Sequence, residues 1–339
     1  MDILSPQLMW IGNRCYRVNS IFDQDDLAGS KNSGYVEEDL YDEDCEEEEF
    51  EIETTDNDRY KTTFHVPKFF FAQIIGTKGA TKKRIEAETK TQIRIPKQGL
   101  DGDIIIIGST RQSVCASRRK VNLIVLAARN KQQFTHFLSI PFTSKEITDN
   151  FIKFKNDILS GPEIFGLESS LFQNPKKLHL TIGTMSLMDN EDRALAAQIL
   201  QNCRESIMKP ILNKYGPLEL ELRGLEYMND EPSAVDVLYG KVESEPLQLM
   251  ANLIQDYFIE KGLMQRKTDT VKLHVTLINS LFRAETSEEN EQNKRITFDA
   301  RSILETYKNF YFGKQQLNEV HLSQRYSTSY EGFYEATGI

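Results

Sequence analysis

The chain has 339 residues and a hydrophobic content of 39%, which is enough for two ordinary domains with their own cores. No apolar run reaches membrane-spanning length, and the first residues lack the apolar segment and cleavage site of a signal peptide. The four cysteines lie far apart and lack metal-ligand spacing. Their spacing argues against a disulfide scaffold and indicates a reducing compartment, either cytosol or nucleus.

The net charge of −10 is distributed unevenly along the chain. Residues 1–57 carry 3 basic and 17 acidic groups, residues 58–133 carry 16 and 5, and residues 134–339 carry 22 and 29. The overall acidity argues against a nucleic-acid partner, but the basic middle block favours one. The three blocks are also the predicted domains.

The first block, residues 1–57, is predicted to be a largely disordered acidic arm, because the run VEEDLYDEDCEEEEFEIE contains no basic residue. A solubilising tail is the favoured interpretation. The alternative is an arm that binds partners or covers the basic block. Before this run, a short apolar patch predicts either a small hairpin or a partner-docking segment; it comprises Leu8, Met9, Trp10, Ile11 and Tyr16.

The middle block, residues 58–133, has a regular pattern of elements from Tyr60 onward. A strand (60–66), a short helix (68–75), a second helix (80–90), two strands (91–96 and 103–108) and a long basic helix (110–131) are expected. The order is β-α-α-β-β-α, with the turn Gly76-Thr77-Lys78-Gly79 between the first two helices.

This order, with its Gly-x-x-Gly turn followed by basic residues, resembles a type I KH domain. The resemblance implies a clamp for about four nucleotides of single-stranded RNA or DNA. Glycines let the backbone approach phosphates closely, and a helix N-terminus attracts them. A KH fold used for protein contact is the alternative. The predicted nucleic-acid-binding residues are Gly76, Thr77, Lys78, Gly79, Lys82, Lys83 and Arg84, with Ile93 and Ile95 on the opposite wall.

The third block, residues 134–339, alternates strands and helices in two comparable halves. Strands are expected near 134–142, 177–182, 218–228, 235–243, 272–277 and 317–327. Helices are expected over 145–159, 190–214 and 246–262. The fold class expected for the whole chain is α+β.

A five-residue motif occurs once in each half, as Lys-Leu-His-Leu-Thr at 177–181 and as Lys-Leu-His-Val-Thr at 272–276. Strand alternation places His179 with Thr181, and His274 with Thr276, on one face, while the aliphatic residues face the core. Two imidazoles can act as base and acid near neutral pH, and two hydroxyls can hold phosphate oxygens. A single His-x-Thr sequence is ordinarily interpreted as structural, but its repetition favours a role in phosphodiester chemistry.

The two His-x-Thr motifs resemble those of the 2H phosphoesterase superfamily. The resemblance implies a bilobal, pseudo-symmetric domain with one motif in each lobe. It also implies that His179 and His274 are general base and general acid on a phosphodiester, such as a 2′,3′-cyclic phosphate or an RNA end. Thr181 and Thr276 would bind phosphate. Neither metal nor cofactor is expected.

Several other polar residues are candidates for this site. By strand alternation Lys177 and Lys272 share a face with their histidines and are candidates for attracting phosphate, with simple solvation as the alternative. His321, with Ser323 and Arg325, is expected to be structural or peripheral. His65 and His136 are expected to be core or surface histidines.

From end to end, the chain resembles a family of subunits of a nuclear, helicase-containing coactivator complex linked to DNA alkylation repair. The stretches GTKGATKKRIEAETKT and FQNPKKLHLTIG carry the resemblance most clearly. The expected function is therefore RNA or single-strand binding joined to phosphodiesterase (hydrolase) activity, in the nucleus and without a membrane. One alternative is an adaptor whose two-histidine cleft binds nucleotide without turnover. Another is a scaffold that docks partners through its acidic arm.

Overall fold

The computed structural model describes residues 8–11, 14–17, 50–55, 57–97, 100, 102–228, 230–283 and 295–337. Most of the predicted acidic arm lies outside these residues. Within it, strands β1 (Leu8–Ile11) and β2 (Arg14–Arg17) pair in antiparallel register, as the hairpin interpretation predicts. Among the described residues, no helix combines the length and apolar character needed to cross a bilayer.

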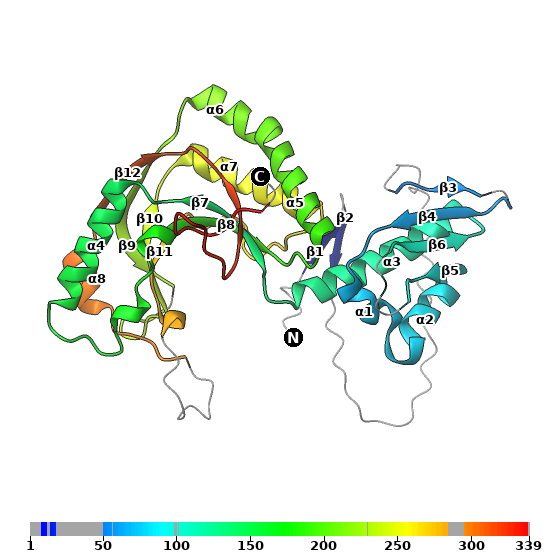
Figure 1. Cartoon of the computed structure of the whole chain (residues 1–339), viewed down its shortest axis with the longest axis horizontal. Helices are drawn as coiled ribbons and strands as arrows, with labels where there is room; N and C mark the ends of the chain where they lie inside the picture. The colour runs from blue at the N-terminus through cyan, green and yellow to red at the C-terminus, as the bar shows by residue number, and fades with distance from the viewer. Residues whose placement is uncertain are drawn as a thin grey trace. The chain divides into compact units, whose positions relative to one another are not determined.

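The chain divides into two compact units (Figure 1). The first contains residues 1–133 with the short segments 188–192 and 260–265, and the second contains the remainder from 134 onward. Each unit is described separately below.

The first unit has the predicted β-α-α-β-β-α order, preceded by one additional strand. Its elements are β3 (Glu53–Thr54), β4 (Tyr60–Phe64), α1 (Phe71–Ile75), α2 (Ala80–Thr89), β5 (Thr91–Arg94), β6 (Ile104–Gly108) and α3 (Arg111–Asn130). The strands form an antiparallel sheet in the order β3-β4-β6-β5. Strand β3 was not expected, because its two residues end the acidic run.

The three helices cover one face of this sheet (Figure 1), and side chains from these helices and from β4, β5 and β6 fill the core. The alternating isoleucines of β6 illustrate the pattern, since Ile104 and Ile106 are fully buried. Helix α3 begins after Thr110, whose hydroxyl accepts a hydrogen bond from the Ser113 amide at 3.1 Å. The order and the sheet confirm the predicted type I KH topology.

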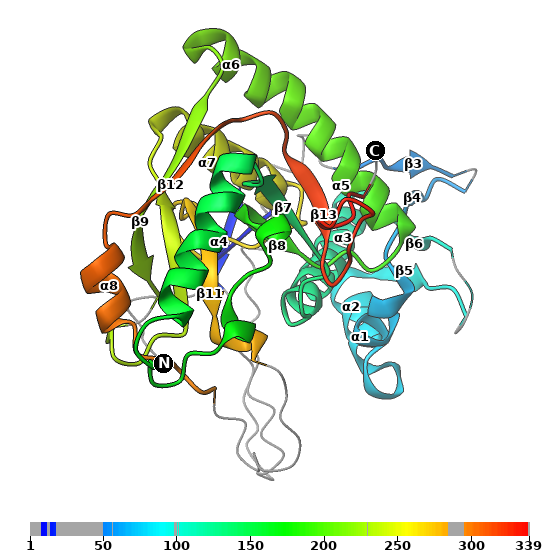
Figure 2. The same ribbon diagram turned by 60° about the vertical axis from the view of Figure 1, so that its left-hand side comes forward.

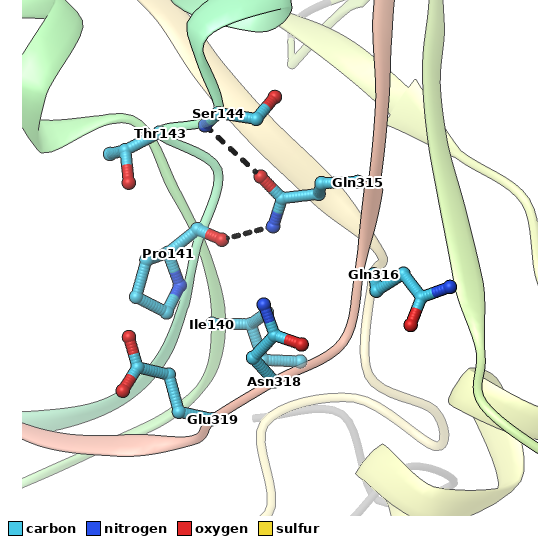
Figure 3. Close-up of a pocket in the computed structure, with 8 residues that line it drawn as sticks. All are labelled: Ile140, Pro141, Thr143, Ser144, Gln315, Gln316, Asn318 and Glu319. Atoms are coloured by element: carbon cyan, nitrogen blue, oxygen red, sulfur yellow. Dashed lines mark hydrogen bonds between the residues drawn. The ribbon is translucent and has the colours of Figure 1, made fainter.

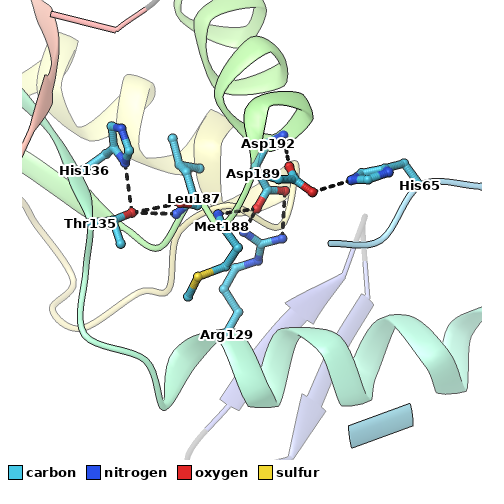
Figure 4. Close-up of polar contacts among 8 residues, drawn as sticks. All are labelled: His65, Arg129, Thr135, His136, Leu187, Met188, Asp189 and Asp192. Carbon is cyan, nitrogen blue, oxygen red and sulfur yellow. Dashed lines mark hydrogen bonds and ion pairs between the residues drawn. The ribbon is translucent and has the colours of Figure 1, made fainter. Parts of the chain in front are cut away.

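A buried ion pair closes the end of α3 within the first unit (Figure 4). The Arg129 guanidinium donates to both carboxylate oxygens of Asp192, at 2.7 and 3.0 Å. Asp192 also accepts from the Met188 amide at 2.9 Å. Asp189 caps this turn by accepting from the Asp192 amide at 2.8 Å. The segment 188–192 is thereby fixed by charge-assisted hydrogen bonds.

The second unit is built on one seven-stranded antiparallel sheet in the order β12-β9-β10-β11-β8-β7-β13. Its strands are β7 (His136–Pro141), β8 (His179–Met185), β9 (Glu219–Tyr227), β10 (Val237–Val242), β11 (His274–Asn279), β12 (Tyr311–Gln316) and β13 (His321–Gln324). The helices are α4 (Lys145–Leu159), α5 (Asn190–Cys203), α6 (Lys209–Tyr215), α7 (Glu245–Glu260) and α8 (Arg301–Tyr307). Strand β12 was missed by the sequence analysis.

The two expected halves are visible in the order of elements, since β7-α4-β8-α5 returns as β10-α7-β11-α8. In each half the first strand pairs with the motif strand, and the two motif strands, β8 and β11, lie side by side in the sheet. The predicted lobes are therefore the two halves of one continuous sheet.

Apolar faces of the helices hold this sheet in place. In α4, the predicted stripe of Ile147, Phe151, Phe154 and Ile158 is buried. The ring of Phe154 packs 5.3 Å from that of Phe312 on β12, and α4 and β12 lie side by side in Figure 2. The expected helix 190–214 is instead interrupted by a π turn at Arg204–Met208, because Pro210 has no N–H to continue the α-helical ladder.

Candidate functional site

The Gly-x-x-Gly turn of the first unit is built from residues with positive φ. Gly76 and Gly79 have φ of 70° and 80°, and Lys78 between them has φ of 51°. A Cβ on Gly76 would lie 2.2 Å from the Thr81 hydroxyl, whereas a Cβ on Gly79 would meet nothing within 4 Å. Gly76 is thus required for packing, and the open backbone at Gly79 leaves room for a phosphate.

The basic residues after this turn differ in their surroundings. Thr77, Lys78, Lys83 and Arg84 are exposed, while Lys82 is half-buried and lies 3.6 Å from Glu86. Ile95 is half-buried, but Ile93 is fully buried in the core. Alternation along β5 points the Ile93 side chain into the core. Ile93 therefore supports the wall of the predicted nucleic-acid groove opposite the Gly-x-x-Gly turn, but it does not form the surface of that wall.

The four motif residues of the second unit come together on one face of the sheet. Leu180 on β8 is paired with Val275 on β11 in antiparallel register. In an antiparallel pair with this register, the residues next to Leu180 and Val275 also lie opposite one another, so His179 is across from Thr276 and Thr181 is across from His274. Leu180 and Val275 themselves are fully buried on the opposite face. Each histidine therefore lies beside the threonine of the other motif.

Both strands begin at the histidine, and the lysines lie before them. Lys177 ends a 3₁₀ turn, Pro175–Lys177, so the expectation that the strand alternation extends to the lysines is wrong. The turned backbone has a chemical consequence. His179 Nδ1 lies 2.8 Å from the Lys177 carbonyl oxygen, and His274 Nδ1 lies 2.7 Å from that of Lys272. Because a carbonyl only accepts, each Nδ1 carries the hydrogen and each Nε2 of the neutral ring has a free lone pair.

Burial keeps both imidazoles neutral near pH 7. Desolvation, with a smaller contribution from the neighbouring His274, lowers the pKa of His179 to about 4 against the opposing effect of the hydrogen bond to Lys177. Desolvation also lowers the pKa of His274, with a smaller contribution from Lys272. Two neutral rings with bare Nε2 atoms form a site that can accept a proton from substrate or solvent.

The two motif lysines have different environments, and neither Nζ is simply a free phosphate ligand. Lys177 Nζ donates to the Ser327 carbonyl at 2.8 Å and to the Thr328 hydroxyl at 2.6 Å, and burial lowers its pKa. Lys272 is exposed, and its Nζ lies 4.5 Å from the centre of the Tyr239 ring. Lys177 therefore ties the C-terminal segment to the first motif.

The other candidate histidines lie outside this cluster. His321 is on the edge strand β13, opposite Ser139, and its Nε2 is 2.9 Å from Glu319. His136 is buried on β7, and desolvation lowers its pKa to about 4. His65 belongs to the first unit, where its Nε2 is 2.8 Å from Asp189 (Figure 4).

His65 also takes part in the group of three potential metal ligands found among the described residues. Its partners there are Asp103 and Glu191, and all three residues are exposed. The Glu191 carboxylate forms an ion pair with His65 Nδ1, and that of Asp103 lies 3.9 Å from the same atom. Ion pairing accounts for this group without a cation.

A polar pocket of about 220 Å³ adjoins the end of β7 (Figure 3). The Gln315 amide bridges its wall, donating to the Pro141 carbonyl at 2.5 Å and accepting from the Ser144 amide at 3.4 Å. Pro141 pairs with His179 across β7 and β8. Gln315 thus fixes the end of the strand that flanks the first motif.

Comparisons with known proteins agree with this geometry. Residues 134–339 match the family model described as AKAP7 2′5′ RNA ligase-like domain, and residues 61–122 match the KH domain model. The chain is 37% identical to activating signal cointegrator 1 complex subunit 1 of Mus musculus, over all of this chain and 99% of the relative. The chain belongs to the activating signal cointegrator 1 complex subunit 1 family. An uncharacterized protein of Schizosaccharomyces pombe is 27% identical over 51% of this chain and 78% of its own length.

Two residues beside the family's paired motifs were missed by sequence reasoning. Tyr239 lies across from Thr276 on β10, and Tyr334 lies in the C-terminal segment. Both contact a motif histidine, with ring centroids 5.3 and 5.2 Å apart. Tyr239 could have been suspected from its strand alternation, but no local signal marks Tyr334, which is 155 residues from His179.

Proposed function

We propose that this protein is an RNA-binding subunit of a nuclear coactivator and alkylation-repair complex and that its second unit is a metal-independent phosphodiesterase. The KH unit would hold single-stranded RNA, and the two-histidine site would act on RNA ends or cyclic phosphates. Other subunits of the activating signal cointegrator complex, a helicase among them, are the proposed partners. The name of the mouse relative and the two family matches support this assignment.

The observation that carries the enzymatic proposal is that the two histidines have the same tautomer. In both motifs Nδ1 donates to the carbonyl two residues earlier, and Nε2 is left as the reactive atom. The register of β8 and β11, which sets each histidine across from the threonine of the other motif, supports the same proposal. This arrangement provides two proton-transfer groups and two hydroxyl donors around one phosphate, as acid–base cleavage requires.

The proposed reaction uses one imidazole as base and the other, once protonated, as acid. The base Nε2 takes a proton from water or from a 2′-hydroxyl as that oxygen attacks phosphorus. The imidazolium gives its proton to the leaving oxygen as the P–O bond breaks. Thr181 and Thr276 donate hydrogen bonds to the non-bridging oxygens, which carry the negative charge.

A second candidate is a nucleotide-binding adaptor without turnover. It is favoured by the lowered pKa values of both histidines, because neither ring is protonated at neutral pH in the empty site. A bound phosphate must raise one of these pKa values before acid catalysis can occur. Binding and turnover are therefore separable at this site.

Product analysis distinguishes the two. Short RNAs with 3′-hydroxyl, 3′-phosphate or 2′,3′-cyclic phosphate ends are incubated with wild type, with His179→Ala/His274→Ala and with His321→Ala, in the presence of a chelator. Turnover by wild type and His321→Ala alone supports the phosphodiesterase. Binding without turnover, lost in the double variant, supports the adaptor.

A further inference from the structure

Each motif histidine is part of a lysine–tyrosine–histidine group, and the two groups have similar distances, although the His179 ring also lies 5.1 Å from that of Phe137. Lys177 Nζ lies 4.7 Å from the centre of the Tyr334 ring, and Lys272 Nζ lies 4.5 Å from that of Tyr239. Each tyrosine meets its histidine nearly edge-on, at interplanar angles of 83° and 70°. Both distances are within the range of cation–π contacts, and both ring pairs have the favoured T-shaped geometry.

The two tyrosines are not at equivalent positions in the two halves of the internal repeat. Tyr239 is on β10, across from Thr276. The corresponding place in the other half is Ser139 on β7, across from Thr181. Ser139 is fully buried, and its hydroxyl lies 2.9 Å from that of Ser323, so no ring can occupy that place. Tyr334 reaches His179 from the C-terminal segment instead.

That segment is held beside the sheet by specific bonds. Lys177 binds Ser327 and Thr328, as described above. The Gln324 amide donates to the Glu335 carbonyl at 2.9 Å, and the Thr337 amide to the Leu322 carbonyl at 2.8 Å. Tyr334 is thus fixed on both sides, and the first lysine both positions the segment and contacts the ring.

The hydroxyl groups of the two tyrosines are already committed away from the histidines. Tyr239 donates to Glu226 at 2.6 Å, and burial together with this carboxylate raises its pKa. Tyr334 bonds to Gln173, and burial raises the pKa of Tyr334 as well. The T-shaped contacts with the imidazoles are therefore made by the rings while the hydroxyls bond elsewhere, which argues against proton transfer by either phenol.

We propose that Tyr239 and Tyr334 are positioning residues that fix the planes of His274 and His179, and that each motif lysine holds its tyrosine in place. This inference rests on the proposed function, because a fixed plane matters only if Nε2 must aim at a phosphate. The Nδ1 bond restrains one edge of each imidazole. The tyrosine ring prevents rotation about that bond and excludes water from one side of the imidazole.

The test compares Leu and Phe at each tyrosine in the full chain. Imidazole ¹⁵N spectra are recorded during a pH titration of the empty protein, and turnover of a 2′,3′-cyclic phosphate RNA is measured separately. Tyr334→Leu is expected to raise the pKa of His179 toward its ordinary value of about 6.5 and to leave His274 unchanged. Tyr239→Leu should raise the pKa of His274 and leave that of His179 unchanged. The unaffected histidine reports in each case that the fold is intact.

Turnover should fall about 10- to 100-fold in each Leu variant, since small misplacements of a catalytic group have effects of this size. Tyr334→Phe keeps the ring and should retain turnover within about 3-fold. Lys272→Met, which removes the charge but keeps the aliphatic stem, should shift His274 in the same direction as Tyr239→Leu but by less. It should leave His179 unchanged.

Two results would overturn the proposal. One is a Leu variant whose partner histidine keeps its titration and tautomer. The other is a Phe variant that behaves like the Leu variant, because the hydroxyl would then be the acting group. If wild type shows no turnover yet the shifts are local as expected, the phosphodiesterase assignment fails and the positioning role stands.

Discussion

The imidazole of His179 donates through Nδ1 to the carbonyl oxygen of Lys177, 2.8 Å away and two residues earlier. In both motifs the strand begins at the histidine, so the carbonyl two residues earlier lies outside the sheet ladder and can accept from Nδ1. The same bond recurs between His274 and Lys272. The backbone before each motif therefore selects the tautomer of the imidazole.

The lowered pKa of His179 predicts a specific dependence of stability on pH. The ring remains neutral to about pH 4 when folded but protonates near pH 6.5 when unfolded. The unfolded state thus binds more protons, so stability falls as pH decreases from about 6.5 to 4 and is not lowered further by this group below that. His179→Gln should reduce the difference in unfolding free energy between pH 7 and 4.5, by on the order of 2 kcal/mol. Urea unfolding at both pH values measures it, and an unchanged difference contradicts the prediction.

Phosphate binding should be coupled to proton uptake. Both rings are neutral in the empty site, and an anion beside them favours the imidazolium. Affinity for adenosine 2′,3′-cyclic phosphate, whose own charge is constant here, should increase as pH falls from 8 to 5, with a limiting slope of about 10-fold per unit for one proton. Calorimetry in two buffers of different ionisation enthalpy counts the proton. His321→Ala should behave like wild type, and affinity independent of pH would exclude the coupling.

Lys78 at the Gly-x-x-Gly turn should contribute to RNA affinity, and α2 offers a matched control at its other end. Lys78 and Lys90 are both exposed and have φ of 51° and 52°, so aspartate imposes the same charge change in the same backbone conformation. Lys78→Asp should weaken binding of a short single-stranded RNA about 10-fold, as loss of a phosphate contact does, and Lys90→Asp by less than about 2-fold. Fluorescence anisotropy measures both affinities. Equal losses would place the RNA elsewhere.

The buried pair of Arg129 and Asp192 should dominate the stability of its surroundings. Asp192→Asn removes the carboxylate from a buried guanidinium and should cost about 3 kcal/mol in the first unit. Arg129→Met/Asp192→Leu should recover most of this loss, because the desolvation of both charges is removed. Glu205→Gln, in an exposed pair with Lys209, should cost less than about 0.5 kcal/mol. Hydrogen exchange of peptides from each unit, with increasing urea, separates these effects.

Elements with a strong local pattern were predictable from sequence. Helix α4 begins and ends as expected, since its apolar stripe has the helical period from Ile147 to Ile158. The four motif residues share a face because alternation is a property of any strand. The burial of Ile93 follows from the same alternation, but which face of β5 is covered depends on packing by the helices.

Features set by distant contacts could not be predicted. The contacts of the Lys177 Nζ depend on Ser327 and Thr328, 150 and 151 residues away. Strand β12 was missed because its glycine, Gly313, weakens the strand pattern; it has φ of 139°. The contact of Tyr334 with His179 requires the whole sheet to form first.

The position of the C-terminal segment has a consequence for inherited or engineered changes. A stop codon after Gln324 would spare His179, Thr181, His274 and Thr276, and every strand of the sheet. The encoded chain would nevertheless lack Tyr334, one of the rings beside His179, and the partners of Lys177. A variant of this kind would pass any inspection of its motifs although the surroundings of His179 had changed. A truncation that leaves every motif residue and every strand in place can therefore still alter the candidate site.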